Sequence, residues 1–507
     1  MRVRERSTVL TQAEVDAVLA PRTVTVRETL DGVNSFVAAD GMVGHYRRTV
    51  TIEPIDGERF RVRQRVEFAL AANIGVWDVL FGSMLFGHLS RIGPNKSRPF
   101  WFPPDEIDAR AVSALARIST LTFILGYTGT LLTQTITYAA EQFGDNKGAQ
   151  GIALASVRLD VALAVPLAFL ADRRGRRWLV VNGTAAACAL SALGALAPNL
   201  LGLTAAQVLA RGVTSACVVI AGVMLAEEMP AGARAWATSL ASMSGFVGAG
   251  ACVLALPLAD LSAGSWRALY VIPLVFIPLA IRNGRHIRET HRYEVHAANR
   301  VTATKTWKVM REHRRRFFLI GGSATLLSLF ATPANQFQNE FLRTERGFSG
   351  AQIAAFLTLT SIPGAVGVIV GGRLAENGRR LVGATATFVG VGMTLAQYYS
   401  YGAMIYATST LGSIVGAAAI PALGVYGAEL FPTEARGAAN GGIGVMSRVG
   451  SVVGLVIAGE LGDRIGLTRA FTYLAIGPLI LVVLILVAYP ETAHHTLEDL
   501  NPEDEPV

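Results

Sequence analysis

Residues 167–181, LAFLADRRGRRWLVV, join two apolar runs through an aspartate and four arginines that surround one glycine. Residues 370–384, VGGRLAENGRRLVGA, nearly repeat this pattern in the second half of the chain. Lys and Arg collect in the short cytosolic loops between membrane spans. We therefore interpret both stretches as cytosolic turns between spanning helices, and the repetition predicts two related halves.

The composition is that of a membrane protein. The 507 residues are 51% hydrophobic and 16% charged, with a mean hydropathy of +0.42. A bilayer core about 30 Å thick needs about 20 apolar residues per helix. Such runs predict twelve spans, at residues 112–140, 149–171, 178–197, 201–225, 235–259, 265–282, 317–341, 351–373, 380–398, 402–427, 437–459 and 467–489. The net charge of +8 comes from arginines between these runs, which argues against a nucleic-acid partner.

Charge also predicts the topology. The longest polar loop follows the sixth run and is rich in Arg and Lys, so we expect it in the cytosol together with both termini. We expect an N-terminal cytosolic segment, two six-helix bundles, a basic loop between them and a cytosolic tail. Their boundaries are 1–108, 109–282, 283–316, 317–489 and 490–507.

Residues 1–108 differ from the rest of the chain. Four stretches, at 23–30, 34–40, 45–54 and 58–70, alternate apolar and polar residues as strands do, and residues 74–92 have helical spacing. The segment is thus predicted to be a small α+β domain. It resembles the C-terminal half of a START-like (helix-grip) ligand domain; a small cytosolic domain of another kind is the alternative.

A second repeat supports the duplication. AEEMPAGAR, residues 226–234, matches AELFPTEAR, residues 428–436, so that Glu227 corresponds to Glu429 and Arg234 to Arg436. Two six-helix halves repeated in parallel are the architecture of transporters that rock around a central site.

The motifs resemble those of the major facilitator superfamily. Its loop G-x-x-x-D-R-x-G-R-R is matched after the second span except that Ala168 replaces the leading Gly, and again after the eighth with Glu376 as the acid and one residue fewer. Its E-x-x-P-x-x-x-R-G turn is matched after the tenth span, and after the fourth except that Ala235 replaces the Gly. In such loops an acid that pairs with a neighbouring arginine or helix N-terminus latches one conformation; arginines that only fix topology are the alternative. The resemblance implies cytosolic gating by Asp172, Arg173, Gly175, Arg176, Arg177, Glu227, Arg234, Gly372, Glu376, Gly378, Arg379, Arg380, Glu429 and Arg436.

The C-terminal YPETAHHTLEDL, with Glu491, resembles the P-E-T-x-G-x-x-L-E ending of sugar porters and related metabolite:proton symporters. The Q-Q pairs of hexose carriers are missing, which puts a hexose substrate in doubt. The fifth span lacks the G-P-x-x-G-G of proton-coupled drug antiporters. The resemblance therefore implies uptake more than export, and Glu491 joins the gating residues.

Four charges fall inside the spans, where each costs about 2.5–3.5 kcal/mol. Arg158, Asp160, Arg211 and Arg448 lie roughly 18–22 Å from the cytosolic helix ends at the α-helical rise, near mid-membrane. Arg158 and Asp160 point to different sides of one helix, so Arg211 is the expected partner of Asp160. We expect Asp160 to take up the proton and Arg211 to respond to its charge. A permanent structural pair is the alternative.

Polar residues at similar depth predict a substrate site. Arg448 lies in an R-x-G motif that resembles organic-ion carriers, so it either contacts an anionic substrate or bridges helices. Amides and phenols suit hydrogen bonding to a polar solute, although some would only join helices. The expected substrate-binding residues are Arg448, Asn335, Gln336, Gln338, Asn339, Gln134, Tyr138 and Tyr127.

The sequence thus predicts an all-α membrane protein of the MFS fold with a small α+β domain. The expected function is proton-coupled uptake of a small polar metabolite (a sugar, organic acid or aromatic acid) across a bacterial plasma membrane. Export of lipophilic compounds is the second hypothesis, and a ligand sensor whose membrane part no longer transports is the third. No enzyme activity, cofactor or metal is expected. The expected partners are substrate, protons and the lipid bilayer, with the protein monomeric.

Overall fold

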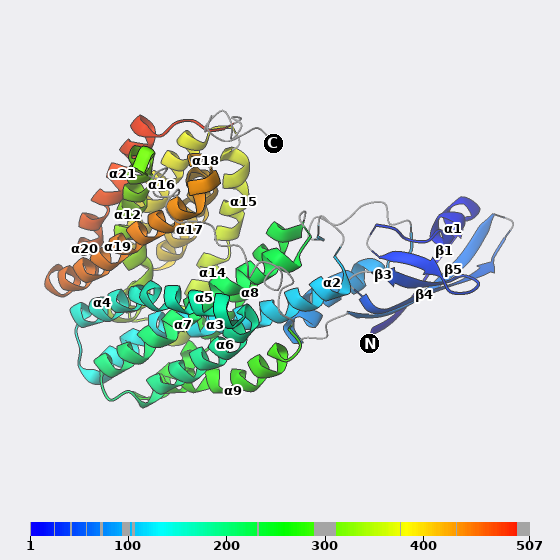
Figure 1. Ribbon diagram of the computed structural model, residues 1–507, viewed down its shortest axis with the longest axis horizontal. Helices are drawn as coiled ribbons and strands as arrows, with labels where there is room; N and C mark the ends of the chain where they lie inside the picture. The colour runs from blue at the N-terminus through cyan, green and yellow to red at the C-terminus, as the bar shows by residue number, and fades with distance from the viewer. Residues whose placement is uncertain are drawn as a thin grey trace.

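The computed structural model describes residues 2–24, 26–40, 43–56, 58–70, 75–93, 102–103, 107–230, 233–287, 311–375, 377–431 and 433–493. An N-terminal sheet domain stands apart from a large helical bundle and connects to it through α2 (Figure 1). The described bundle helices fall into two halves, α3 to α9 and α12 to α21. The predicted combination of an all-α membrane fold and a small α+β domain is confirmed.

The sheet domain holds five antiparallel strands in the order β1-β5-β4-β3-β2. The elements are β1 (Arg2–Thr11), α1 (Gln12–Leu19), β2 (Arg27–Leu30), β3 (Ser35–Asp40), β4 (Val43–Pro54), β5 (Arg59–Leu70) and α2 (Gly75–Leu89). The last four strands and α2 were predicted, whereas β1 and α1 were not. β1 is an edge strand whose residues are nearly all exposed, so it lacks the alternation that marks a half-buried strand.

The core of the sheet domain contains a buried ion pair. Arg48 donates to Glu28 at 2.5 and 2.8 Å, and Tyr46 donates to the same carboxylate at 2.6 Å. The guanidinium of Arg48 also lies 4.1 Å from the ring centroid of Phe36. Buried charges are tolerated when they are paired and hydrogen-bonded in this way.

The first half of the bundle runs from α3 to α9. Its elements are α3 (Ala109–Phe143), α4 (Lys147–Ser156), η1 (Val157–Asp160), α5 (Val161–Arg174), α6 (Arg176–Leu193), η2 (Gly194–Leu196), α7 (Leu200–Glu228), α8 (Arg234–Leu254), η4 (Leu256–Asp260) and α9 (Arg267–Gly284). The second half runs from α12 to α21. Its elements are α12 (Arg314–Gln336), α13 (Gln338–Glu340), η5 (Phe341–Glu345), α14 (Gly350–Ser361), α15 (Gly364–Ala375), α16 (Arg379–Tyr399), α17 (Ala403–Gly424), α18 (Tyr426–Glu429), α19 (Thr433–Ile465), α20 (Leu467–Leu474) and α21 (Ile476–Ala488).

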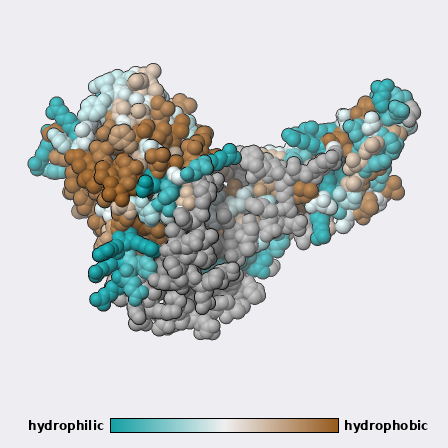
Figure 2. Space-filling view, turned by 90° about the horizontal axis from the view of Figure 1, so that it is seen from above, coloured by the Kyte–Doolittle hydropathy of each residue, from teal (hydrophilic) through white to brown (hydrophobic). Residues whose placement is uncertain are grey.

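Among the described residues, eleven helices are long and apolar enough to cross a membrane. The predicted second span does not form one continuous helix. It consists of α4, η1 and α5, because the 3-10 turn Val157–Asp160 interrupts the α-helix where two charged residues lie. Figure 2 shows apolar surface gathered over the helical bundle and hydrophilic side chains on the sheet domain.

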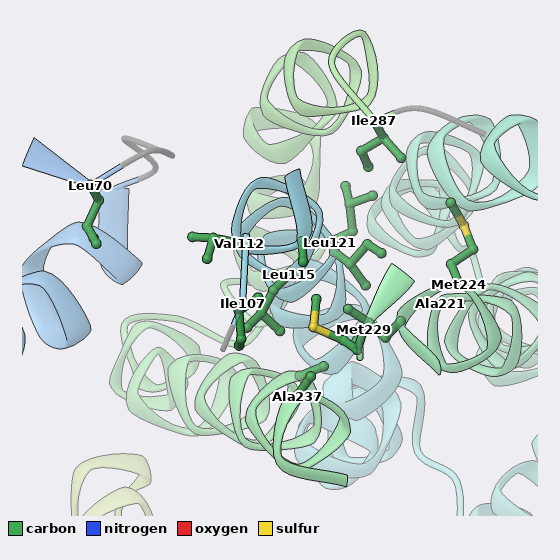
Figure 3. Close-up of a cluster of buried hydrophobic side chains, with 14 of the residues drawn as sticks. Leu70, Ile107, Val112, Leu115, Leu121, Ala221, Met224, Met229, Ala237 and Ile287 are labelled. Atoms are coloured by element: carbon green, nitrogen blue, oxygen red, sulfur yellow. The ribbon is translucent and has the colours of Figure 1, made fainter. Parts of the chain in front are cut away.

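The two ends of the bundle are packed differently. We call the end that carries the N-termini of α6, α12 and α16 the basic face, and the end with the C-termini of α3 and η5 the opposite face. One buried apolar cluster near the opposite face combines both halves, with Leu131 and Trp266 from the first and Phe337 and Phe471 from the second. Near the basic face each half has its own cluster. The cluster of the first half surrounds α3, where Leu115 lies beside Met229 (Figure 3), and it continues through Leu89 of α2 to Leu70 of β5 in the sheet domain. The described residues therefore join the halves mainly at the opposite face.

Candidate functional site

The intramembrane charges meet at Asp160, in the turn η1. One carboxylate oxygen accepts a hydrogen bond from Ser215 at 2.5 Å and lies 4.0 Å from Nε of Arg211, both on α7. The other oxygen lies 3.6 Å from Nε of Arg448 on α19. The carboxylate side chain is only 7% exposed, while the two arginines are 34% and 43% exposed. Asp160 therefore lies between an arginine of its own half and an arginine of the other half.

A glycine on the facing helix helps to position this centre. Gly129 on α3 has no side chain, and an added Cβ would lie 3.1 Å from Nη1 of Arg211, so the glycine gives the guanidinium room. Arg158, two residues before Asp160, makes no ion pair with a described residue. The structure thus brings Asp160 and Arg211 together, as the sequence suggested, and adds Arg448.

A second group of charges links the halves at the opposite face. Arg343 of η5 donates to Glu141 of α3 at 2.7 Å and to Asp260 of η4 at 2.9 Å. Asp260 also accepts a hydrogen bond from the backbone N–H of Gly350, at the start of α14. Burial lowers the pKa of Arg343, but the bonds to the two carboxylates outweigh this and hold it above its ordinary value. These contacts close the opposite face.

The same face is closed by backbone contacts between α4 and α19. Asp463 accepts hydrogen bonds from the N–H groups of Lys147 and Gly148 at 2.9 and 2.7 Å, at the N-terminus of α4. A Cβ at Gly151 would lie 2.6 Å from the carbonyl oxygen of Leu455 and 3.2 Å from Cα of Gly459. Glycine is therefore required for the two helices to approach this closely.

The structure does not bring the expected substrate residues together: Arg448 lies at the Asp160 centre, and the others lie in three further places. Four of them join the halves or face that joint: Gln336 accepts from Thr133 at 2.5 Å, Asn339 donates to Gln134 at 2.7 Å, and the ring of Tyr138 lies 4.1 Å from the guanidinium of Arg343. Tyr127 lies in the core of the first half, where it donates to the carbonyl of Leu269 at 3.1 Å.

Asn335 and Gln338 lie elsewhere, on the wall of a cavity of about 650 Å³ formed by the second half. Other polar lining residues include Thr387, Thr394, Gln397 and Ser409, and none of the described residues on this wall is charged. A cavity of this size suits a small organic solute. Uncharged hydrogen-bonding groups on its wall suit the neutral part of such a molecule.

Comparison with known proteins agrees with this architecture. Two matches to the model of the Major Facilitator Superfamily cover residues 118–338 and 317–506. The chain belongs to the Major Facilitator Superfamily. It is accordingly a multi-pass membrane transporter and not an enzyme. No curated protein sequence matches the chain significantly.

Solved structures with a similar fold include a bacterial homologue of the human lysosomal transporter Spinster in an inward-facing, unoccupied conformation. It is 17% identical, with a TM-score of 0.63, and the match covers 77% of this chain and 97% of that chain. The xylose transporter XylE from E. coli, in an inward open conformation, is 14% identical with a TM-score of 0.59, covering 78% and 100%. The nucleoside transporter NupG is 11% identical with a TM-score of 0.60, covering 74% and 100%. At these identities the likeness shows the fold alone.

The superfamily motifs lie at the basic face of this transporter. Arg176, at the start of α6, pairs with Glu227 at the end of α7, and Arg379, at the start of α16, pairs with Glu429 of α18. The two ion pairs occupy equivalent places in the two halves, and each joins helices of one half. Gly175 has a φ of 104°, which favours glycine, whereas Gly378, at 168°, is extended. Gly371 makes a close approach to Ala418, whereas a Cβ at Gly372 would meet only Pro421, at 3.9 Å.

The other expected gating residues are less fully described. Glu376 and the side chains of Asp172, Arg173, Arg234 and Arg436 lie outside the described part of the chain. Arg177 reaches the carbonyl of Arg285 at 3.5 Å, and Arg380 donates its backbone N–H to Glu491 at 3.2 Å.

Glu491 caps a helix of the second half. Its carboxylate accepts the backbone N–H groups of Arg379 and Arg380 at 3.0 and 3.2 Å, at the N-terminus of α16. Partial burial raises the pKa of Glu491, but hydrogen bonds from Ala493, Arg379, Arg380 and Thr492 bring it below its ordinary value. The P-E-T motif thus fixes the C-terminal segment to the N-terminus of α16.

Sequence reasoning missed the charged residues of the opposite face. Glu141, Asp260, Arg343 and Asp463 lie at helix ends, where isolated charges look like ordinary solvent-exposed residues. Their signal was that this face carries few Lys and Arg residues, so that Arg343 stands out as a partner for the acids around it.

Proposed function

We propose that this transporter takes up a small polar metabolite together with protons, and that Asp160 is the proton-binding residue. The observation that supports this is the position of the Asp160 carboxylate, 4.0 Å from Arg211 and 3.6 Å from Arg448. Ionised Asp160 attracts both guanidinium groups, one from each half. Protonation removes that attraction and leaves two like charges, which favours a rearrangement of the halves.

The same geometry gives Arg448 a role in substrate binding. While Asp160 is ionised, Arg448 has a carboxylate partner. Once Asp160 is protonated, Arg448 becomes available to an anionic group of an organic or aromatic acid. The uncharged cavity wall with Asn335 and Gln338 would hold the neutral part of the solute or, for a sugar, its hydroxyls. Proton and substrate would then bind together, as symport requires.

The sidedness belongs to the same proposal. The positive-inside tendency favours the basic face, with both termini, on the cytosolic side of a bacterial plasma membrane. The closed opposite face then corresponds to an inward-facing state. Latching at the basic face by Glu227, Glu429 and the neighbouring arginines would hold the outward-facing state. We expect the protein to act as a monomer.

The first test identifies a ligand. The purified protein is screened by thermal shift with sugars, organic acids, aromatic acids and lipophilic cations. A ligand at 100 times its Kd stabilises the folded state by about 2.7 kcal/mol. Stabilisation by a polar metabolite supports the proposal. A response confined to lipophilic compounds favours the exporter instead.

The second test uses that ligand in proteoliposomes with the outside more acidic than the inside. We expect the wild-type protein to accumulate the ligand only while the gradient lasts. Asp160→Asn should abolish accumulation but retain exchange of ligand across the membrane, because it removes the proton and not the binding site. Glu460→Gln, which alters an exposed acid paired with Arg464 within α19, is the matched control. Gradient-driven accumulation by Asp160→Asn at the wild-type rate would refute the coupling role.

A further inference from the structure

A buried carboxyl group lies at the closed joint between the two halves, away from the Asp160 centre. Glu340, the last residue of α13, is 4% exposed. Its carboxylate accepts a hydrogen bond at 3.1 Å from Nε2 of Gln150, on α4 of the other half, which is 3% exposed. This contact exists only while α4 and α13 are together at the opposite face.

Glu340 has no cationic partner. Among the described residues, no Lys, Arg or His nitrogen lies within 4.0 Å of its carboxylate, and its side chain is hydrogen-bonded to Gln150. The charged groups on the surrounding elements have other partners: Arg343 bonds Glu141 and Asp260, Lys147 pairs with Glu345 at 3.5 Å, and Asp463 accepts from the start of α4. An isolated carboxylate is costly to bury, and such a group becomes neutral instead.

Gln150 supplies a second observation. Its amide oxygen, Oε1, is buried and has no hydrogen-bond partner. Buried polar atoms without a partner are rare in folded proteins. A protonated Glu340 carries an O–H donor, so it can donate to Oε1 of Gln150 while its other oxygen accepts from Nε2 of the same amide. One proton therefore satisfies both the buried acid and the buried amide.

We propose that Glu340 is a second proton-binding site, which takes up a proton from the opposite face when the two halves close there. Opening separates α13 from α4 and exposes both side chains to water. There Glu340 loses its amide partner and releases the proton. Because closing binds one proton, the ratio of closed to open molecules increases as the pH falls, by up to about tenfold per pH unit. This device does not depend on the proton at Asp160.

The test measures gate opening against pH in the full-length protein in lipid nanodiscs. Spin labels are attached to Leu201→Cys on α7 and Met404→Cys on α17, which are 77% and 62% exposed and lie at the opposite face in different halves. The native cysteines Cys188, Cys217 and Cys252 are all buried and need no replacement. Distances between the two labels, measured by double electron-electron resonance, then give the fractions of closed and open molecules from about pH 5 to about pH 8.

We expect the closed fraction of the wild-type protein to rise as the pH falls. Glu340→Gln keeps an amide pair with Gln150 but cannot ionise, so in the Asp160→Asn background it should stay closed across the range with no pH response. Glu460→Gln, an exposed acid on α19, should keep the wild-type response. In the Asp160→Asn background, a closed fraction that does not change with pH, or a response that persists when Glu340→Gln is added, would overturn the proposal.

Two further measurements make the result specific. The infrared band of a protonated carboxyl should be present in the closed protein and absent from Glu340→Gln; a spectrum unchanged by the substitution contradicts the proposal. The pH series is also repeated in Asp160→Asn. If the pH response of closing is retained in Asp160→Asn and disappears when Glu340→Gln is added, the response belongs to Glu340. This conclusion holds whatever the outcome of the transport test at Asp160.

Discussion

Replacing Gly151 by alanine should open the face that the structure shows closed. A Cβ at this position would lie 2.6 Å from the carbonyl oxygen of Leu455, against about 3.4 Å for ordinary contact. The obstacle is backbone, which cannot rotate away as a side chain can. The helices α4 and α19 must therefore separate by about 0.8 Å, or the closed state must tolerate the overlap.

The expected magnitude follows from the cost of overpacking. An extra methyl group in a tightly packed site costs about 1–3 kcal/mol. Only the closed state bears this cost, because opening separates the two helices. The ratio of closed to open molecules should therefore fall by roughly 5- to 150-fold. Gly459→Ala should act in the same direction, since its Cβ would lie 2.6 Å from the carbonyl oxygen of Lys147.

The assay is the distance between spin labels at Leu201→Cys and Met404→Cys. We expect Gly151→Ala to move population from the short to the long distance. Gly250→Ala on α8 is the matched control, because nothing lies within 4 Å of a Cβ there. A distance distribution for Gly151→Ala that equals the wild type would refute the reasoning. So would an equal shift in the control, which would show that helix propensity rather than the contact is responsible.

Three other substitutions test separate parts of the structure. Glu491→Gln should lower the stability of the second half by about 1 kcal/mol near neutral pH. Because the pKa of Glu491 is depressed in the folded protein, this difference should be full above the ordinary value of a glutamate, about 4.3, and should be lost as the pH falls from there through the depressed pKa; a difference that persists below that pKa contradicts the cap. Glu28→Ala leaves Arg48 buried without its carboxylate and should cost the sheet domain about 3–5 kcal/mol. The rate of backbone hydrogen exchange should then rise in β2 to β5 but not in the bundle. Exchange in those strands as slow as in the wild type would contradict this expectation. Gly175→Ala, at a φ of 104°, should cost about 1–3 kcal/mol in thermal unfolding, and more than Gly378→Ala; equal effects would disprove the turn argument.

The fold could be predicted because its signals are local. Apolar runs of spanning length and arginine-rich turns each lie within a few dozen residues, so the sequence alone indicates the two halves. The edge strand β1 could not be predicted, because its exposed residues carry no alternation between a buried and a solvated face. Similarly, the break in the second span is invisible to hydropathy, which does not distinguish a 3-10 turn from an α-helical one.

The candidate site was only partly predictable, because it is made by contacts between the halves. The depth of Asp160 and Arg211 could be counted along their helices, and the structure brings them within 4.0 Å. Arg448 approaches the same carboxylate only because of the way the two halves pack together. No local sequence pattern determines that packing. Glu340 was overlooked for the same reason: it follows a run of amides at a helix end, and its burial comes from α4 of the other half.

The geometry of η1 explains why Arg158 remains outside the ion pairs. Two residues apart on an α-helix are about 200° apart around the axis, and on a 3-10 helix about 240°. In either case Arg158 and Asp160 cannot face the same partner. Asp160 faces α7 and α19, whose arginines lie 4.0 and 3.6 Å away, so Arg158 must lie on another side of the turn. A mid-helix 3-10 turn is also a common position for a hinge. The proton-binding carboxylate that we propose therefore lies on the segment of the second span best able to change its backbone when that charge is neutralised.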